Sequence, residues 1–238
     1  VWQIRLFSDK GELLHLKRGI YRLDNIIVKN ILGIGISPFA MNATACLVAI
    51  FVNQRLLEYG GDLAVGAFGI ANRVAFIFIM INFGVNQGMQ PIAGYNYGAQ
   101  NYDRLMRVLK LAMIAGTCIT TSGFLVAEFI PHICVRLFTS DSELTELSVN
   151  GLRIMMAAMP IVGYQMIVTN FFQSIGKAKI SIFLSLSRQL LFLVPLIGVM
   201  PLFFGVNGVW VAMPISDSFS AIFALVMMVR YMRVFKKR

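Results

Sequence analysis

Six long apolar stretches account for most of this chain, and each reaches the roughly 20 residues that a helix needs to cross the hydrocarbon core of a membrane. A segment inside hydrocarbon must satisfy its own backbone hydrogen bonds, which for apolar runs of this length requires a helix. The sequence therefore predicts an all-α, polytopic integral membrane protein whose six transmembrane helices form a bundle. The predicted spans are residues 31–54, 64–95, 109–135, 149–175, 180–204 and 206–229.

Charged residues are scarce in this chain. It is 58% hydrophobic and 13% charged, with a mean hydropathy of +0.74, whereas a soluble domain carries about 25% charged residues. The net charge of +10 would favour a nucleic-acid partner if the basic residues formed a binding face, but they fall in the connections between apolar stretches. We therefore expect contact with membrane lipid and with no nucleic acid.

Lys and Arg residues gather in every second connection between the predicted spans. Cytoplasmic connections of membrane proteins carry this excess under the positive-inside rule. We therefore predict a protein integral to the plasma (cell inner) membrane with both termini in the cytoplasm. The basic connections are residues 1–30, 96–110, 176–180 and 230–238, and the loops between them, at 59–62, 131–146 and 201–208, contain Arg136 as their one Lys or Arg.

Three segments follow from this pattern. Residues 1–30 form a basic cytoplasmic linker, residues 31–230 a six-helix transmembrane lobe, and residues 231–238 a basic cytoplasmic tail. Within the linker, apolar residues recur at helical spacing between basic ones, which favours an amphipathic helix on the membrane surface over a plain polar linker. The apolar positions are Leu13, Leu16, Ile20, Leu23 and Ile27, and the basic ones are Lys17, Arg18, Arg22 and Lys29.

Amide side chains are concentrated in the second and fourth predicted spans. Asn82, Asn86 and Gln90 are spaced by four residues and therefore share one face of a helix. Because an amide that faces lipid finds no partner, we predict that this face contacts protein or water. Two interpretations stay open: hydrogen bonds between helices, worth roughly 0.6–2 kcal/mol each, or the wall of an aqueous cavity. A similar face on the fourth span carries Gln165, Thr169 and Gln173.

One carboxylate, Asp217, lies in the middle of an apolar span. A charge at that depth needs a partner or a function, so Asp217 either pairs with Arg188 on the preceding span or carries a coupling ion. No motif of a catalytic site occurs, and Cys46, Cys118 and Cys134 lack the spacing of metal ligands. The sequence thus predicts neither an enzyme nor a metal site nor an organic cofactor.

Several motifs resemble those of one transporter family. The run from Met89 to Ala99, MQPIAGYNYGA, resembles the signature with which multidrug and toxic compound extrusion (MATE) proteins close a helix at the cytoplasmic face. The resemblance extends over about residues 20–235, in order and without large gaps. Three further segments are similar to the tenth, eleventh and twelfth helices of that family: Tyr164–Ala178, Arg188-Gln189 with Pro195 and Pro201, and Gly208–Asp217.

This resemblance implies that the chain is the C-terminal lobe, helices seven to twelve, of a twelve-helix transporter. It further implies export of cationic or amphipathic drugs or toxic metabolites in exchange for Na⁺ or H⁺, with the missing N-terminal lobe as a partner and one lobe rocking against the other. The chain departs from the family where some members have coupling carboxylates. The corresponding positions near Cys46 and Val168 are apolar here, and Asn42 and Asn170 are the nearest polar residues.

The inner face of this lobe is the predicted substrate surface. Met and aromatic side chains would hold the apolar parts of a drug and amides its polar groups, with Asp217 as the candidate ion-coupling residue. Two other functions stay open: a lipid-linked oligosaccharide flippase of the same superfamily, which needs a more cationic cavity, and a membrane protein with a structural role and no transport. The predicted substrate-binding residues are Asn42, Asn72, Phe76, Met80, Asn86, Gln87, Tyr164, Asn170 and Gln189.

Overall fold

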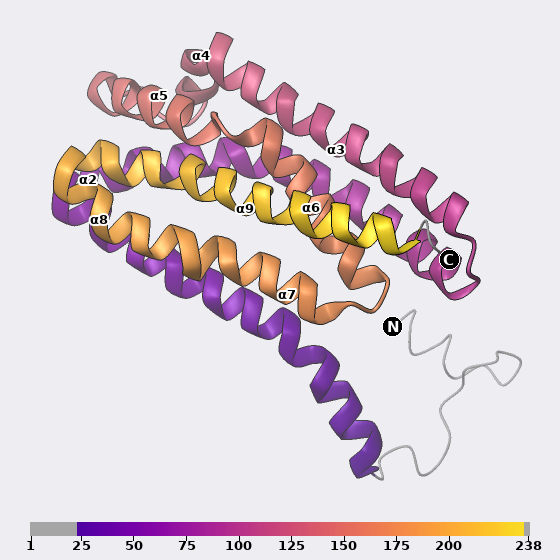
Figure 1. The fold of residues 1–238 in the computed structure, drawn as a ribbon. Helices are drawn as coiled ribbons and strands as arrows, with labels where there is room; N and C mark the ends of the chain where they lie inside the picture. Colours follow the sequence, from indigo (N-terminus) through magenta and orange to yellow (C-terminus); the bar gives the residue numbers. More distant parts are fainter. Residues whose placement is uncertain (1–22, 236–238) are drawn as a thin grey trace, which may run out of the picture. The chain divides into compact units, whose positions relative to one another are not determined.

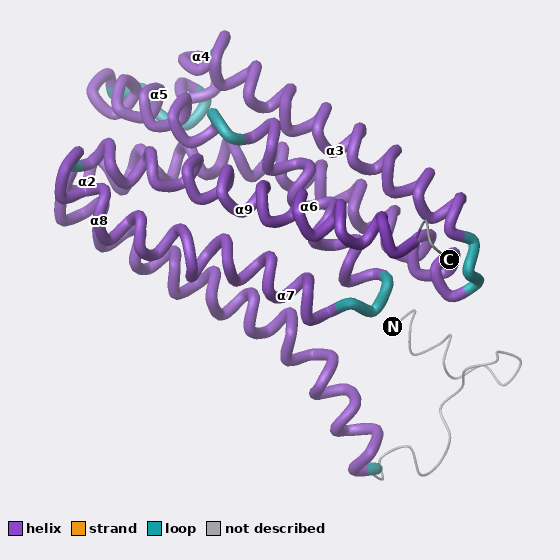
Figure 2. The backbone as a smooth tube through the Cα atoms, viewed as in Figure 1, coloured by secondary structure: helices purple, strands orange, loops and turns teal. Residues whose placement is uncertain are grey.

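The computed structural model describes residues 23–235, which form helices joined by short turns (Figure 1, Figure 2). No strand occurs among these residues, so the all-α prediction is confirmed. Most of the amphipathic helix predicted for residues 1–30 lies outside the described residues. The elements in chain order are α2 (Asn25–Gly98), α3 (Tyr102–Phe129), α4 (Pro131–Arg136), α5 (Ser142–Met156), α6 (Met159–Ser174), α7 (Ala178–Leu186), the π-helix η1 (Ser187–Leu193), α8 (Val194–Phe204) and α9 (Val206–Phe235).

The chain divides into two compact units, Val1–Ala40 and Met41–Arg238. In the first unit, α2 begins at Asn25, and the side chains of Leu23, Ile26 and Ile27 are exposed. The second unit contains every residue of the predicted substrate and ion sites. Both apolar clusters of the structure lie within that second unit.

The chain reverses direction within α2, as Figure 1 shows, and the non-helical residue inside this helix is Gly61. Gly61 has φ 65° and ψ −167°, a backbone conformation that only glycine adopts without strain. Positive φ angles also occur at Gly176, between α6 and α7, and at Gly205, between α8 and α9. Each of these glycines lies in a connection expected between two spans, at 59–62, 176–180 and 201–208, and the turn there lets two neighbouring helices run antiparallel.

The number of membrane crossings follows from these reversals. Within the described residues, four helices are long and apolar enough to cross a membrane, and the bent pair α5–α6 makes a fifth. One of the four, Asn42–Gly98, has 57 residues, more than twice the roughly 20 that one crossing needs. Because the chain reverses at Gly61 inside it, that helix accounts for two crossings. By length and composition, the six predicted spans are confirmed with changed boundaries.

Two predicted spans are shorter or more broken than the sequence suggests. The span predicted at 149–175 is split into α5 and α6, which meet at an angle of 50°. Pro160 lies in the first turn of α6, where it has no N–H to continue the hydrogen-bond ladder of α5. Pro131 begins α4 in the same way, so the span predicted at 109–135 ends at Phe129.

The span predicted at 180–204 contains a π-helical segment that the sequence pattern does not predict. The π-helix η1 separates α7 from α8, and Pro195 follows it in the first turn of α8. Proline cannot donate a hydrogen bond to the preceding turn, which favours a wider turn there. Because π-helical turns are rare and frequently mark functional sites, this segment is a candidate part of the site.

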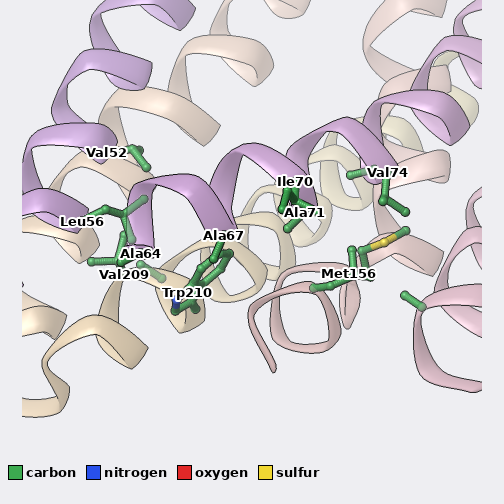
Figure 3. Packing of buried hydrophobic residues seen from close by; sticks show 14 of the residues in the cluster. Val52, Leu56, Ala64, Ala67, Ile70, Ala71, Val74, Met156, Val209 and Trp210 are labelled. Carbon is green, nitrogen blue, oxygen red and sulfur yellow. The ribbon is translucent and has the colours of Figure 1, made fainter. Parts of the chain in front are cut away.

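The largest apolar core lies between α2, α5 and α9 (Figure 3). Trp210 on α9 is 1% exposed, and its ring centroid lies 5.8 Å from that of Phe68 on α2. Its ring packs against Gly151 on α5, where an added Cβ would lie 2.5 Å from the indole. Figure 3 shows Trp210 beside Ala67 of α2, and Met156 of α5 belongs to the same cluster. This core fixes the second half of α2 against α5 and α9.

A second apolar cluster joins α3, α6, α7 and α9 to the end of α2. Phe171 and Phe172 on α6 are fully buried within it. The backbones of α3 and α6 come so close that a Cβ on Gly163 would lie 2.5 Å from the carbonyl oxygen of Gly116. Small residues allow such close approach between membrane helices. Together the two clusters pack the helices of the second unit into one bundle.

Candidate functional site

A cavity of about 260 Å³ lies inside the second unit. Its wall is formed by both halves of α2, by α5 and α6 on either side of their bend, by η1 and by α9. Aliphatic side chains and methionines make up most of this wall. The lining residues are Ala45, Val48, Ala49, Val52, Phe68, Asn72, Ile79, Met155, Met159, Val162, Arg188, Gln189, Leu193, Met213 and Asp217.

An ion pair joins two helices at this cavity. The Nε of Arg188 on η1 lies 2.5 Å from Oδ1 of Asp217 on α9, so the pairing that the sequence left open is confirmed. The side chain of Asp217 is 10% exposed and that of Arg188 is 34% exposed. Ser216, next to Asp217, donates a hydrogen bond of 2.8 Å to the carbonyl oxygen of Arg188. Two adjacent residues of α9 thus hold the π-helical segment at Arg188.

Two amide side chains complete the polar part of the cavity. Asn72 reaches the wall from the second half of α2, and Gln189 reaches it from η1. The Oε1 atom of Gln189 is buried and accepts no hydrogen bond from the described residues. Since Arg188 and Asp217 are the only charged side chains among the lining residues, the cavity has no net charge when the pair is formed.

The structure brings three of the predicted site residues together and separates the rest. Asn72, Gln189 and Asp217 line the cavity. Phe76, Met80 and Gln87 are exposed on the second half of α2, outside the set of lining residues. Asn42 is exposed on the same helix as Ala45 and Ala49, about one turn before the cavity wall.

Tyr164 and Asn170, both on α6, also lie outside the cavity wall. Tyr164 is half-buried and packs against the second apolar cluster. The amide of Asn170 accepts a hydrogen bond from Nε2 of Gln90 at 3.4 Å and donates one to the carbonyl oxygen of Met166 at 2.9 Å. Asn170 therefore links α6 to α2.

The predicted amide face of the second span lies in helix packing. Asn82 and Asn86 are fully buried, so the prediction that this face contacts protein or water, and not lipid, is confirmed. The Nδ2 of Asn86 donates to the carbonyl oxygen of Asn82 at 3.1 Å, and the Nδ2 of Asn82 lies 3.5 Å from the sulfur of Met166 on α6. The structure thus places Asn86 between helices, away from the cavity wall, because its face of α2 is covered by the bundle.

The amide face of the fourth predicted span has a similar arrangement. Gln165 is buried on α6 and its Nε2 donates to the hydroxyl oxygen of Ser220 on α9. Thr169 is buried one turn later and donates to the carbonyl oxygen of Gln165 at 2.9 Å. Gln173 is exposed at the end of the helix. This face therefore contributes hydrogen bonds within the bundle.

Several lining residues are not among the predicted site residues. Met155 and Met159 lie on either side of the bend between α5 and α6, and Val162 and Met213 face the same space. Methionine is common in apolar spans and by itself indicates nothing about a site. Pro160 was the available signal, because a break in a spanning helix leaves irregular backbone that is tolerated where it is buried or lines a cavity.

Comparisons with known proteins agree with this architecture. The family signature described as MatE matches residues 34–197. The multidrug export protein MepA of Staphylococcus aureus (strain N315) is 25% identical over 219 residues, which cover 92% of this chain and 48% of that protein. The MATE multidrug transporter DinF-BH, whose structure was solved as a complex, is 35% identical with a TM-score of 0.82, covering 96% of this chain and 52% of that one.

A third comparison concerns the fold alone. The outward-facing structure of a multidrug resistance MATE family transporter superposes with a TM-score of 0.84 at 21% identity, over 98% of this chain and 52% of that one. The bundle therefore defines the class of protein: an all-helical membrane protein with the fold of one transporter lobe. The MatE signature covers more than half of the length of this chain, so the chain belongs to the MatE family. The chain spans about half the length of the curated relatives that it matches.

Proposed function

We propose that this chain is one lobe of a secondary active antiporter that exports cationic or amphipathic small molecules in exchange for Na⁺ or H⁺. The observation that carries this proposal is the cavity, which combines a largely apolar wall with two amides and one ion pair. The relatives named as a multidrug export protein and a multidrug transporter support it. Drugs or toxic metabolites would be the small-molecule partners.

The chemistry of the cavity suits compounds that are apolar over most of their surface. Met155, Met159 and Met213 are flexible and polarisable, so they can adapt to ring systems of different shape. The amides of Asn72 and Gln189 supply hydrogen-bonding groups, while the carboxylate of Asp217 is neutralised by Arg188. This mixture is typical of small-molecule sites, which are mostly apolar with a few placed polar groups.

The size of the cavity supports a partnership with a second lobe. Its volume of about 260 Å³ is below the roughly 300–1,000 Å³ of pockets that hold drug-sized ligands. The exposed face of α2 carries Arg73, Phe76, Met80 and Gln87, and a charged or amide side chain that faces lipid is costly. We infer that this face meets the missing N-terminal lobe or the water between the lobes, and that alternating access comes from one lobe rocking against the other.

Coupling to an ion is assigned to the carboxylate of the cavity. Asp217 is the one acidic side chain on the cavity wall, and acidic residues at membrane depth often lie on ion or proton pathways. The positions near Cys46 and Val168, where some family members carry carboxylates, are apolar in this chain. We therefore propose Asp217 as the coupling residue of this lobe, with Na⁺ or H⁺ as the ion.

A flippase for lipid-linked oligosaccharides is the alternative within the same superfamily. Recognition of a pyrophosphate requires an excess of positive charge in the cavity. Here the single cation of the cavity wall, Arg188, is neutralised by Asp217 at 2.5 Å. This balance leaves no excess positive charge for a pyrophosphate, and the relationship to named multidrug transporters favours transport over a purely structural role.

The proposed location is the plasma (cell inner) membrane, with both termini in the cytoplasm. The support is the distribution of Lys and Arg, which alternates with the six crossings in the sense of the positive-inside rule. In this orientation the turns at Gly61 and Gly205 lie outside, and the turn at Gly176 lies in the cytoplasm.

Dye efflux from cells tests the proposed function. We expect cells that express this chain joined to a second six-helix lobe to expel a cationic rhodamine dye faster than cells with an empty vector. Cells that express residues 1–238 alone should stay at background, because the cavity of one lobe holds only part of such a molecule. An imposed inward gradient of Na⁺ or of protons should accelerate the efflux. Absence of efflux from the two-lobed protein, or full efflux from the single lobe, would contradict the proposal.

A further inference from the structure

The two side chains of the ion pair at the cavity are buried to different extents. The carboxylate of Asp217 is 10% exposed and therefore held by the bundle, whereas the side chain of Arg188 is 34% exposed. Among the described residues, the side chain of Arg188 makes one hydrogen bond, from Nε to Oδ1 of Asp217. A guanidinium group has five N–H donors, and the bond to Asp217 uses one of them. Of the two partners, Arg188 is the one that can leave.

Two amide side chains line the same cavity as Asp217 and carry oxygen atoms that can bind a small cation. Gln189 follows Arg188 on η1, and its Oε1 is buried with no donor among the described residues. A buried acceptor without a donor is unfavourable, and a metal cation, a protonated carboxyl group or a water would satisfy it. Asn72 brings a second amide to the same wall. Carboxylate and amide oxygens are the ligands that hard cations prefer.

We propose that Arg188 acts as a tethered cation that competes with a small inorganic cation, Na⁺ or H⁺, for the carboxylate of Asp217. When the inorganic cation binds, it neutralises Asp217, the contact between Nε and Oδ1 breaks, and the guanidinium moves into the cavity. When the cation leaves, Arg188 returns. This inference rests on the proposed function and deepens it. When the coupling ion leaves Asp217, Arg188 takes its place, so that no unpaired carboxylate remains inside the bundle.

The surroundings of Asp217 support competition at a single site. Arg188 is the only other charged group among the residues lining the cavity, and none of the remaining lining residues titrates. An incoming cation therefore meets one carboxylate and one rival cation. In addition, Ser216 and Asp217 together hold η1 at Arg188. Release of Arg188 removes one of these two links and so connects the state of the ion site to the π-helical segment.

Thermal unfolding of the purified chain in lipid nanodiscs tests this inference without any transport step. The unfolding midpoint is measured while NaCl replaces choline chloride at constant ionic strength, and separately while the pH is lowered at constant Na⁺. If the guanidinium of Arg188 is bound to the Asp217 carboxylate about nine-tenths of the time, replacing Arg188 should raise the apparent affinity of that carboxylate for the small cation about tenfold. We therefore expect Arg188→Gln to be stabilised by Na⁺ or by acid at about one-tenth of the cation concentration that the wild-type chain requires.

Three further variants separate the possible causes. The double variant Arg188→Gln/Asp217→Asn should lose the response because it has no carboxylate. Arg55→Gln is the matched control, since it removes the guanidinium from the exposed pair between Arg55 and Glu58, 2.7 Å apart, and should behave as wild type. Adding Gln189→Leu to Arg188→Gln should weaken a response to Na⁺, which uses several oxygen ligands, and preserve a response to protons.

The responses of these variants to the cations decide whether the inference holds. If Arg188→Gln responds to neither cation, or if the double variant still responds, the pair is structural and the inference fails. If Arg188→Gln does not fold, Arg188→Lys replaces it: a weaker competitor should strengthen the cation response, and an unchanged response overturns the inference. Because these measurements need no efflux, failure of the proposed function would show as absent dye export with the cation response intact.

Discussion

Replacing Asp217 with Asn is expected to destabilise the chain by about 3 kcal/mol, because it leaves Arg188 inside the bundle without its counter-charge. The partial exposure of Arg188, 34%, keeps this value at the lower end of the range for broken buried pairs. The free energy of unfolding, measured by titration with SDS in mixed micelles, gives the effect. The double variant Arg188→Gln/Asp217→Asn should recover much of the loss, since neither charge then remains unpaired.

A matched control for this prediction is the pair of Arg55 and Glu58, whose carboxylate side chain is 56% exposed, against 10% for Asp217. Exposed ion pairs contribute about 0–1 kcal/mol, so Glu58→Gln should change the free energy of unfolding only slightly. If Asp217→Asn is no more destabilising than Glu58→Gln, the buried pair does not hold η1 to α9 as the structure indicates.

Truncation of Trp210 should have the largest effect on stability. Trp210 is 1% exposed, fills the space above Gly151 and lies 5.8 Å from the ring of Phe68. Replacing a buried aromatic side chain with alanine leaves a cavity and typically costs about 3–5 kcal/mol. We therefore expect Trp210→Ala to lower the free energy of unfolding by about 4 kcal/mol.

Phe203 provides the comparison for this second prediction. It is also aromatic, but it lies at the end of α8 and is 75% exposed. Phe203→Ala should therefore leave the free energy of unfolding nearly unchanged in the same titration. Emptying a packed aromatic site usually costs far more than about 1 kcal/mol. If Trp210→Ala lowers the free energy of unfolding by less than that, α2, α5 and α9 are not tightly packed around Trp210.

The crossings and turns of this protein could be predicted because they depend on local sequence. Apolar runs long enough to span the bilayer identify helices wherever they occur, and glycine identifies turns such as those at Gly61, Gly176 and Gly205. The pairing of Arg188 with Asp217 was also accessible, since two opposite charges at membrane depth on adjacent spans have few other partners.

The cavity could not be predicted, because it depends on how distant segments pack. Its wall combines residues from α2, α5, α6, η1 and α9, and no periodicity within one helix shows which face another helix will cover. Asn72 and Asn86 illustrate the difficulty: both are amides on the same span, but Asn72 lines the cavity and Asn86 is fully buried between helices. The π-helix at Ser187–Leu193 was equally hidden, since only Pro195 marks it in the sequence.

The most direct test of the central claim is substrate protection of a cysteine at Asn72. The test uses the two-lobed protein with Cys46, Cys118 and Cys134 replaced, because Cys46 and Cys118 are exposed in the structure. A small water-soluble methanethiosulfonate reagent should modify Asn72→Cys, and the exported rhodamine dye at saturating concentration should slow that reaction several-fold. Asn86→Cys should react poorly with or without the dye, because Asn86 is fully buried.

A cysteine at the exposed Asn207, outside the cavity, serves as the control for general effects of the dye. We expect its reaction rate to be the same with and without the rhodamine dye. Slower reaction confined to Asn72→Cys is the result that the proposed site predicts. Equal rates at Asn72→Cys in the presence and absence of a dye that the same protein exports would contradict the claim that this cavity binds the transported compound.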